Sequence, residues 1–195
     1  KLPEFEIAYA HTVRTVAAWA HAHAGDTDAA LAAIAEALAS PFPQGRFETL
    51  LEAADVVGTY LDPERGGALL AEAEAVGART EAERTYLGLF QAETLNRLGM
   101  PHEALTALDP IADGRHTGYP GFYVRVKLAR AVAALLAGSG ARRSLVAAAK
   151  AQAELQGAAG TLRALQLLES LDEGQGPASS AIAALWSVEP GIVTA

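Results

Sequence analysis

Two similar stretches decide the fold: Ala24-Gly25-Asp26-Thr27-Asp28-Ala29-Ala30-Leu31 and Leu98-Gly99-Met100-Pro101-His102-Glu103-Ala104-Leu105. Each is typical of a helix that ends on a glycine, turns, and restarts with a polar first turn, because glycine adopts the left-handed conformation that closes helices. Weaker copies occur at 62–69 and 138–145. The repetition predicts helical hairpins that recur every 36 to 41 residues, measured between Ala30, Ala68, Ala104 and Leu145.

The composition indicates an all-α protein. Among 195 residues there are 45 alanines and 25 leucines, both strong helix formers, against 5 Phe, 5 Tyr and 2 Trp. The hydrophobic share of 51% excludes a disordered chain. The lack of cysteine excludes a disulfide scaffold, a thiolate zinc site and a cysteine nucleophile. No apolar run reaches the roughly 18–20 residues of a membrane helix, so we expect no membrane partner.

The first residue is lysine, and no signal peptide is recognisable. We therefore expect either a processed protein or a piece of a longer one, located in the cytoplasm, with a composition typical of a GC-rich bacterial genome. Periodicity and breaker residues predict a single domain over 1–195, built from hairpins at about 4–40, 46–78, 80–113 and 120–156 and a terminal helix pair at 158–188. Small residues are expected where the two helices of each hairpin cross.

This pattern resembles tetratricopeptide repeats (TPR). In the first hairpin the matching positions are Ala18, Gly25, Ala30 and Ala37, and in the third they are Ala92, Gly99 and Ala104, with Ile111 in place of an alanine. The second keeps Ala68 and Ala75 but has Val56 and Pro63 at the earlier positions. The resemblance implies a right-handed α-α superhelix, similar to the repeat regions of large bacterial transcription activators, with an inner surface formed by the first helix of each hairpin.

No pattern in the sequence supports catalysis or a bound metal or cofactor. His21 and His23 lie two residues apart, so on a helix they point in different directions and cannot share an ion. The chain has no Gly-x-Ser-x-Gly elbow and no phosphate-binding loop, and Gly138-Ser139-Gly140 lies in a turn. Carboxylates two residues apart, such as Glu81 and Glu83, are expected on solvated helix faces. We therefore predict a protein that is not an enzyme.

Charge is unevenly distributed, and it suggests where a partner binds. Residues 1–109 carry 7 basic and 17 acidic side chains, whereas 110–165 carry 8 basic and 2 acidic ones. A solvated basic face is one interpretation, and a stripe that steers an acidic partner is the other. On the second interpretation, an acidic, partly apolar peptide binds an inner groove lined by aromatic, basic and polar residues, which are Trp19, His23, Tyr86, Glu93, Asn96, Arg97, Tyr123, Lys127 and Arg130.

The leading hypothesis is therefore a non-catalytic protein-interaction scaffold of a bacterial regulator. Two alternatives stay open. The first is a nucleic-acid-binding regulator that uses the basic 115–163 segment, although a net acidic chain is a poor general DNA binder. The second is a small-ligand sensor with a pocket between hairpins. Self-association is a further open point, and each aromatic side chain named above could instead fill the core.

Overall fold

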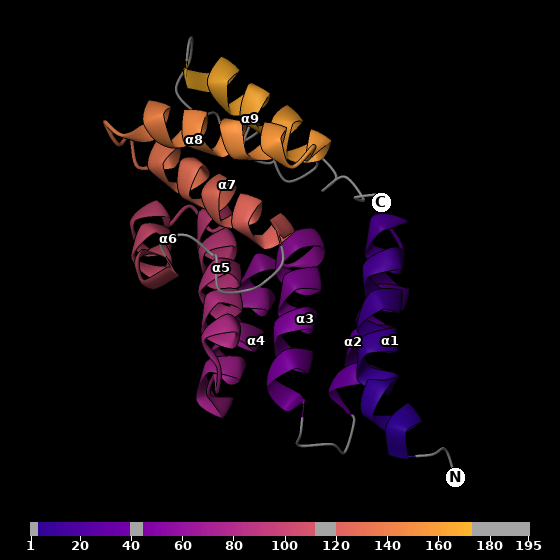
Figure 1. Ribbon diagram of the computed structural model, residues 1–195. Helices are drawn as coiled ribbons and strands as arrows, with labels where there is room; N and C mark the ends of the chain where they lie inside the picture. The colour runs from indigo at the N-terminus through magenta and orange to yellow at the C-terminus, as the bar shows by residue number, and fades with distance from the viewer. Residues whose placement is uncertain (1–3, 40–44, 112–119, 173–195) are drawn as a thin grey trace. The chain divides into compact units, whose positions relative to one another are not determined.

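The computed structural model describes residues 4–39, 45–111 and 120–172 (Figure 1). Within these ranges the regular structure is helical, with no strand, which confirms the predicted all-α class. The elements are α1 (Glu4–His23), α2 (Thr27–Leu38), α3 (Arg46–Val56), the π-helix η1 (Val57–Leu61), α4 (Pro63–Val76), α5 (Glu81–Arg97), α6 (Pro101–Leu108), the 3-10 helix η2 (Asp109–Ile111), α7 (Pro120–Leu136), α8 (Arg142–Leu155) and α9 (Ala159–Asp172). The second helix of the predicted terminal pair lies outside the described residues.

The chain divides into two compact units, unit 1 at Lys1–Phe90 and unit 2 at Gln91–Ala195, and the boundary falls within α5. We number the helix pairs as hairpin 1 (α1 and α2), hairpin 2 (α3 with η1, and α4), hairpin 3 (α5 and α6) and hairpin 4 (α7 and α8). That residues 1–195 form one repeat domain stays a prediction.

In unit 1 the two hairpins pack on each other through their first helices. Helix α1 contacts α2 and α3, and α3 also contacts α2 and α4. The Thr15 hydroxyl of α1 donates a hydrogen bond to Glu52 Oε2 of α3 at 2.5 Å. Arg46 at the start of α3 donates to the carbonyl of Leu38 at 2.8 Å and lies 3.5 Å from the carboxylate of Glu72 in α4. This arginine therefore joins three helices of the unit.

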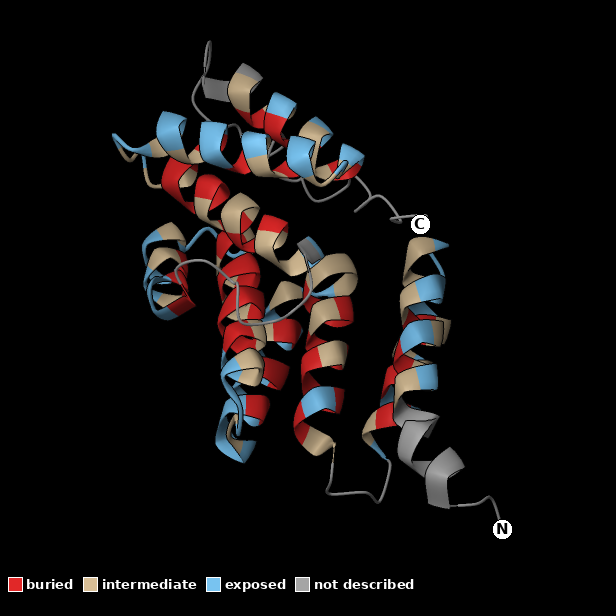
Figure 2. Ribbon diagram, in the orientation of Figure 1, coloured by how far each residue is buried: buried red, intermediate tan, exposed pale blue. Residues whose placement is uncertain are grey.

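In unit 2, helix α7 lies at the centre of the packing. It contacts α6, α8 and α9, and α8 also contacts α9. Figure 2 shows buried residues along α7 and mostly exposed or intermediate ones along α8. The core cluster comprises Val124, Ala131, Val132 and Leu135 of α7, Val146, Ala149 and Ala153 of α8, and Ala164, Leu165 and Leu168 of α9.

Glycine turns close most of the helices, as the sequence predicts. The glycines Gly25, Gly99, Gly138 and Gly157 have positive φ angles of 77°, 73°, 64° and 64°. The residue after each glycine donates its N–H to the carbonyl five positions earlier, for example Asp26 to His21 at 2.9 Å and Met100 to Leu95 at 2.9 Å. This is the 6→1 hydrogen bond of the Schellman motif, which satisfies carbonyls at the helix end.

Hairpin 2 turns differently. Asp62 donates to Val57 at 2.7 Å, again a 6→1 hydrogen bond, but the preceding residue is Leu61, and no non-glycine residue of the described chain has a positive φ. A leucine is disfavoured in the left-handed conformation, so the helix widens into the π-helix η1 instead. The Asp62 side chain then caps α4 by accepting hydrogen bonds from the backbone of Glu64 and Arg65.

The small residues predicted at the crossings of hairpins 1 and 3, which are Ala18, Ala30, Ala92 and Ala104, are fully buried. In hairpin 2 the prediction was wrong, because Ala68 and Ala75 are exposed. The buried small residues there are Ala54, Gly66 and Ala73. Helix α4 begins at Pro63, so Gly66 takes the fourth helical position, as Ala30 does in α2 and Ala104 in α6.

The crossing at Gly66 is very close. A Cβ atom placed on it would lie 2.4 Å from Gly58 Cα, 2.7 Å from Gly58 N and 3.3 Å from the carbonyl oxygen of Ala54. Real Cβ atoms do not approach backbone atoms this closely, so only glycine fits here. The pair Ala54 and Gly66 lies twelve residues apart, like the pairs Ala18–Ala30 and Ala92–Ala104.

Candidate functional site

An aromatic cluster lies near the turns of hairpins 1 and 2 in unit 1. It consists of Trp19 and His23 in α1 and Tyr60 in η1, with ring centroids 4.1 Å apart for Trp19–His23 and 4.6 Å apart for His23–Tyr60. All three residues are partly exposed. The structure thus brings the two predicted residues together and adds Tyr60, which the sequence reasoning missed because nothing in the sequence signalled the π-helix that carries it.

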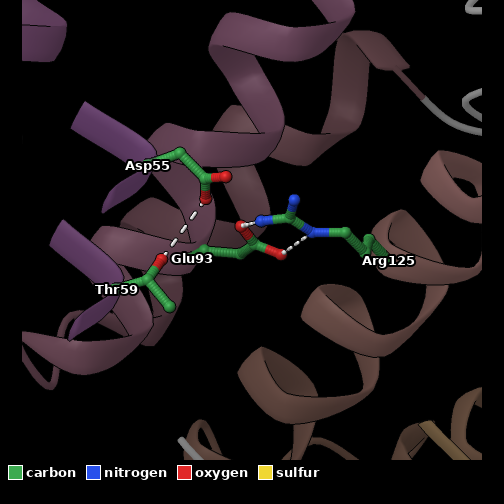
Figure 3. A network of polar contacts seen from close by, with 4 residues as sticks. All are labelled: Asp55, Thr59, Glu93 and Arg125. Carbon is green, nitrogen blue, oxygen red and sulfur yellow. Dashed lines mark hydrogen bonds and ion pairs between the residues drawn. The ribbon is translucent and has the colours of Figure 1, made fainter. Parts of the chain in front are cut away.

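A polar contact joins the π-helix to α3. Thr59 in η1 donates a hydrogen bond to the carboxylate of Asp55 in α3 at 3.3 Å (Figure 3). These residues are four apart and therefore adjacent on the helix surface. The contact lies beside Tyr60 in sequence, so the η1 segment that carries the aromatic ring is also tied to α3.

In unit 2, Glu93 forms a bidentate ion pair with an arginine that was not among the predicted site residues. Arg125 of α7 donates through Nε to Glu93 Oε1 at 3.1 Å and through Nη2 to Oε2 at 2.5 Å (Figure 3). The side chain of Glu93 is only 11% exposed, and that of Arg125 is 32% exposed. Paired, planar contacts of this kind are the strong form of ion pair. Glu93 thus links α5 to α7.

Asn96 has a similar role one helical turn further along α5. It is 1% exposed, and its Nδ2 donates to the carbonyl of Ala129 in α7 at 3.0 Å. A buried residue of this kind is not available to a partner on an open groove. Both Glu93 and Asn96 therefore have a structural role within unit 2 that the predicted groove did not include.

The basic residues of α7 make separate contacts. Lys127 Nζ lies 4.9 Å from the ring centroid of Tyr123, a cation–π geometry in which both residues are partly exposed. Arg130 instead donates to the carbonyl of Leu108 at 2.6 Å. That carbonyl lies at the end of α6, where a cation is favoured by the helix dipole. Only the Tyr123–Lys127 pair keeps the mixed aromatic and basic character that was predicted for the groove.

The two remaining predicted residues lie on α5. Tyr86 in the unit 1 part of α5 is partly exposed, and its ring centroid is 6.4 Å from that of Phe90. Arg97 is the last residue of α5 and is also partly exposed. Neither position decides between core packing and partner binding.

Much of the basic 110–165 segment is used inside unit 2. Arg125 pairs with Glu93, Arg130 contacts the end of α6, and Lys150 of α8 lies 3.0 Å from the carboxylate of Glu169 in α9. By sequence, unit 1 has a net charge of −8 and unit 2 a net charge of zero. Arg115 lies outside the described residues. Three of the eight basic residues of this segment thus bond to carboxylates or a carbonyl group of the same unit.

The described residues contain no group of three or more His, Cys, Asp or Glu side chains that could hold a metal ion. In the same part of the chain, no helix combines the length and the apolar character needed to span a membrane. Comparison with protein-family models, with curated proteins and with solved structures gives no match for this chain. The resemblance to TPR proteins therefore stays a prediction.

Proposed function

We propose that the chain is a TPR-like α-α superhelix that acts as a non-catalytic protein-interaction scaffold, as part of a cytoplasmic bacterial transcription regulator or signalling protein. One observation carries the proposal. Three hairpins repeat a buried pair of small residues twelve positions apart, Ala18–Ala30, Ala54–Gly66 and Ala92–Ala104. Repeats that stack on their neighbours form extended surfaces, which such proteins use to bind partners.

The packing of first helices supports this architecture. In unit 1 the first helix of hairpin 1 contacts the first helix of hairpin 2. In unit 2 the part of α5 that carries Glu93 and Asn96 bonds to α7, and α7 contacts α9. Neighbour-to-neighbour contact between first helices is the arrangement expected of a solenoid.

For the partner we keep an acidic, partly apolar peptide and narrow its site to Tyr123 and Lys127. The tyrosine ring offers apolar area, and the ammonium group above it can pair with a carboxylate. Exposed charges of this kind contribute little to affinity, about 0.2–1 kcal/mol each, and act mainly on the association rate. Arg130 is left out of the site because it bonds to Leu108.

The test uses peptides selected from a random library on the intact chain. We expect the selected sequences to be rich in Asp, Glu and aromatic residues. Lys127→Glu should slow their association and flatten its salt dependence, while helicity and melting stay unchanged. Arg163→Glu, an exposed position on α9, is the control with the same charge change. Selected peptides of no common charge, or equal effects of the two variants, would contradict the site.

A second candidate, a small-ligand sensor, is favoured by two buried polar atoms of unit 2. Asn96 Oδ1 and Arg130 Nε have no hydrogen-bond partner within the described residues. Asn96 donates to the carbonyl of Ala129 in α7, the helix that also carries Arg130. Buried polar atoms are normally satisfied, so a small molecule with both a donor and an acceptor suits them.

A thermal-shift screen of small polar compounds tests this candidate, since a ligand that binds only the native state raises the melting temperature. Arg130→Lys keeps the charge but removes the Nε–H group. We expect it to abolish the shift. A shift that persists in Arg130→Lys would place the ligand elsewhere, and the absence of any shift across the screen would leave the peptide scaffold as the better supported function.

A further inference from the structure

The aromatic cluster of Trp19, His23 and Tyr60 contains a buried polar atom without a hydrogen bond. His23 Nε2 is buried and has no hydrogen-bond partner within the described residues. Buried polar atoms normally have such a partner, so this nitrogen is an exception. The imidazole instead lies between two rings, with its centroid 4.1 Å from that of Trp19 and 4.6 Å from that of Tyr60. The cluster therefore combines aromatic surface with an unused nitrogen.

The rings of the cluster keep part of their surface in contact with solvent. All three side chains are partly exposed, and the imidazole is tilted by 57° against Trp19 and by 51° against Tyr60. Tilted rings cover each other's faces less completely than parallel ones. The face of an aromatic ring is the negative part of its quadrupole and attracts a cation within about 6 Å of the ring centre. The cluster is thus suited to a positively charged group.

The two turns beside the cluster carry an excess of negative charge. Asp26 follows His23 by three residues and Asp62 follows Tyr60 by two, and both aspartates begin the next helix of their hairpin. The exposed carboxylates at these turns are those of Asp26, Asp28, Asp62 and Glu64, against the exposed basic side chains of His21 and Arg65. Unit 1 as a whole has a net charge of −8. A basic partner is therefore complementary to this end of the unit.

We propose that the aromatic cluster binds an arginine side chain from a basic segment of a partner protein. A guanidinium group is planar, stacks on aromatic faces and presents five N–H donors in its plane, whereas a lysine ammonium is a compact, strongly hydrated charge. A guanidinium stacked on Trp19 or Tyr60 keeps donors at its edge for the flanking carboxylates. When a ring of the cluster turns aside, the same edge supplies His23 Nε2 with the hydrogen bond it lacks.

The emission of Trp19 tests this proposal directly. The chain has two tryptophans, so Trp186→Phe leaves Trp19 as the reporter. We expect a peptide of six arginines to change its emission saturably, at a concentration about fivefold lower than a peptide of six lysines, because only the guanidinium stacks. A peptide of six glutamates should cause no change. Equal affinities of the arginine and lysine peptides would reduce the effect to net charge and overturn the arginine site.

Substitutions show whether the cluster is responsible. Tyr60→Leu should weaken binding of the arginine peptide by about fivefold, since it removes one aromatic face, and Tyr60→Phe should leave the affinity nearly unchanged. Tyr86→Leu, at a partly exposed tyrosine of α5 in the same unit, is the matched control and should bind like the parent. Equal affinities of Tyr60→Leu and Tyr86→Leu would contradict the proposal.

A quenching measurement covers the case in which Tyr60→Leu fails to fold, because it needs no substitution in the cluster. The bound arginine peptide should protect Trp19 from quenching by acrylamide. A Trp19 that stays equally accessible at saturating peptide would overturn the site.

Methylguanidinium tests a different occupant of the cluster. If it changes the Trp19 emission at the same concentration as the arginine peptide, the site belongs to a small cation and the partner segment is wrong. Lys127→Glu should leave binding of the arginine peptide unchanged. Failure here is therefore distinguishable from failure of the proposed function, which concerns acidic peptides at Tyr123 and Lys127 in unit 2.

Discussion

Hairpins 1 and 2 reach the same geometry by two different turns. Hairpin 1 closes on Gly25 with a φ of 77°, and hairpin 2 closes through the π-helix that ends at Leu61. In both, the residue that caps the next helix, Asp26 or Asp62, donates its backbone N–H to the carbonyl five positions earlier. Both keep twelve residues between the small residues that cross. The comparison teaches that the repeat is defined by this spacing across the turn, and that a glycine is one of two ways to achieve it.

The largest expected effect is at the crossing of hairpin 2. Gly66→Ala should destabilise the fold by about 3 kcal/mol or more, since overpacking typically costs about 1–3 kcal/mol and here the added Cβ meets backbone atoms. Urea unfolding measures the change. Ala68→Gly, two residues along on the exposed face, should cost about 1 kcal/mol through helix propensity. Helix propensity alone would make Gly66→Ala stabilising and Ala68→Gly destabilising. A stabilising Gly66→Ala would therefore show that Gly66 is not at a close crossing.

The next effect tests whether the crossings of hairpins 1 and 3 are equally tight. Ala30→Leu and Ala104→Leu should each cost about 1–3 kcal/mol, because both positions are fully buried against a neighbouring helix. Ala35→Leu on the exposed face of α2 should change the free energy of unfolding by less than about 0.5 kcal/mol. Equal values at buried and exposed positions, measured by denaturant titration, would contradict the twelve-residue alignment.

A smaller effect is expected at the positive-φ turn glycine, which hairpin 2 lacks and which can be tested at Gly138. Gly138 has a φ of 64°, and Gly140 in the same turn has no strained backbone angle and no atom within 4 Å of an added Cβ. Gly138→Ala should therefore cost about 1–2 kcal/mol, whereas Gly140→Ala should be neutral or slightly stabilising. The difference in melting temperature between the two variants measures the cost of placing a non-glycine residue at a positive φ angle. Equal melting temperatures would contradict the role of glycine in these turns.

The smallest effect separates the two caps. Asp62 accepts two backbone hydrogen bonds and Asp26 accepts one. Loss of a cap costs typically about 1 kcal/mol, so Asp62→Ala should cost somewhat more than Asp26→Ala. Thermal unfolding followed by circular dichroism resolves the order. A larger loss at Asp26 would mean that the glycine turn depends on its cap more than the π-helical turn does.

Local signals in the sequence were enough to predict the all-α class and several helix ends. Gly25, Gly99 and the alanines after them specify helix ends and crossings through backbone conformation and side-chain size, which are properties of short segments. The alignment of hairpin 2 failed because Pro63 was matched to the turn glycine, when Asp62 is the cap and Leu61 the equivalent position. The Thr80 capping box, in which the Thr80 hydroxyl accepts from the backbone of Glu83 and Glu83 accepts from that of Thr80, follows a known pattern that was overlooked.

The candidate site was harder to predict, because it depends on which side chains meet across helices. Nothing in a single sequence pairs Glu93 with Arg125 or Asn96 with the carbonyl of Ala129, which lie more than thirty residues apart. Polar residues on a first helix can line an open surface or join neighbouring helices, and periodicity is the same in both cases. Tyr60 depends on the π-helix, whose five-residue hydrogen bonding leaves no compositional mark.

Helix α5 has a further consequence for dissecting the chain. Its residues 81–90 belong to unit 1 and its residues 91–97 to unit 2, so the two units share one uninterrupted helix. Truncation at the boundary would leave ten residues of helix on one fragment and seven on the other, fewer than the roughly 12–15 residues that an isolated helix needs for marginal stability. Neither fragment would retain a complete α5, so a fragment boundary placed at the end of this helix, after Arg97, keeps the helix whole.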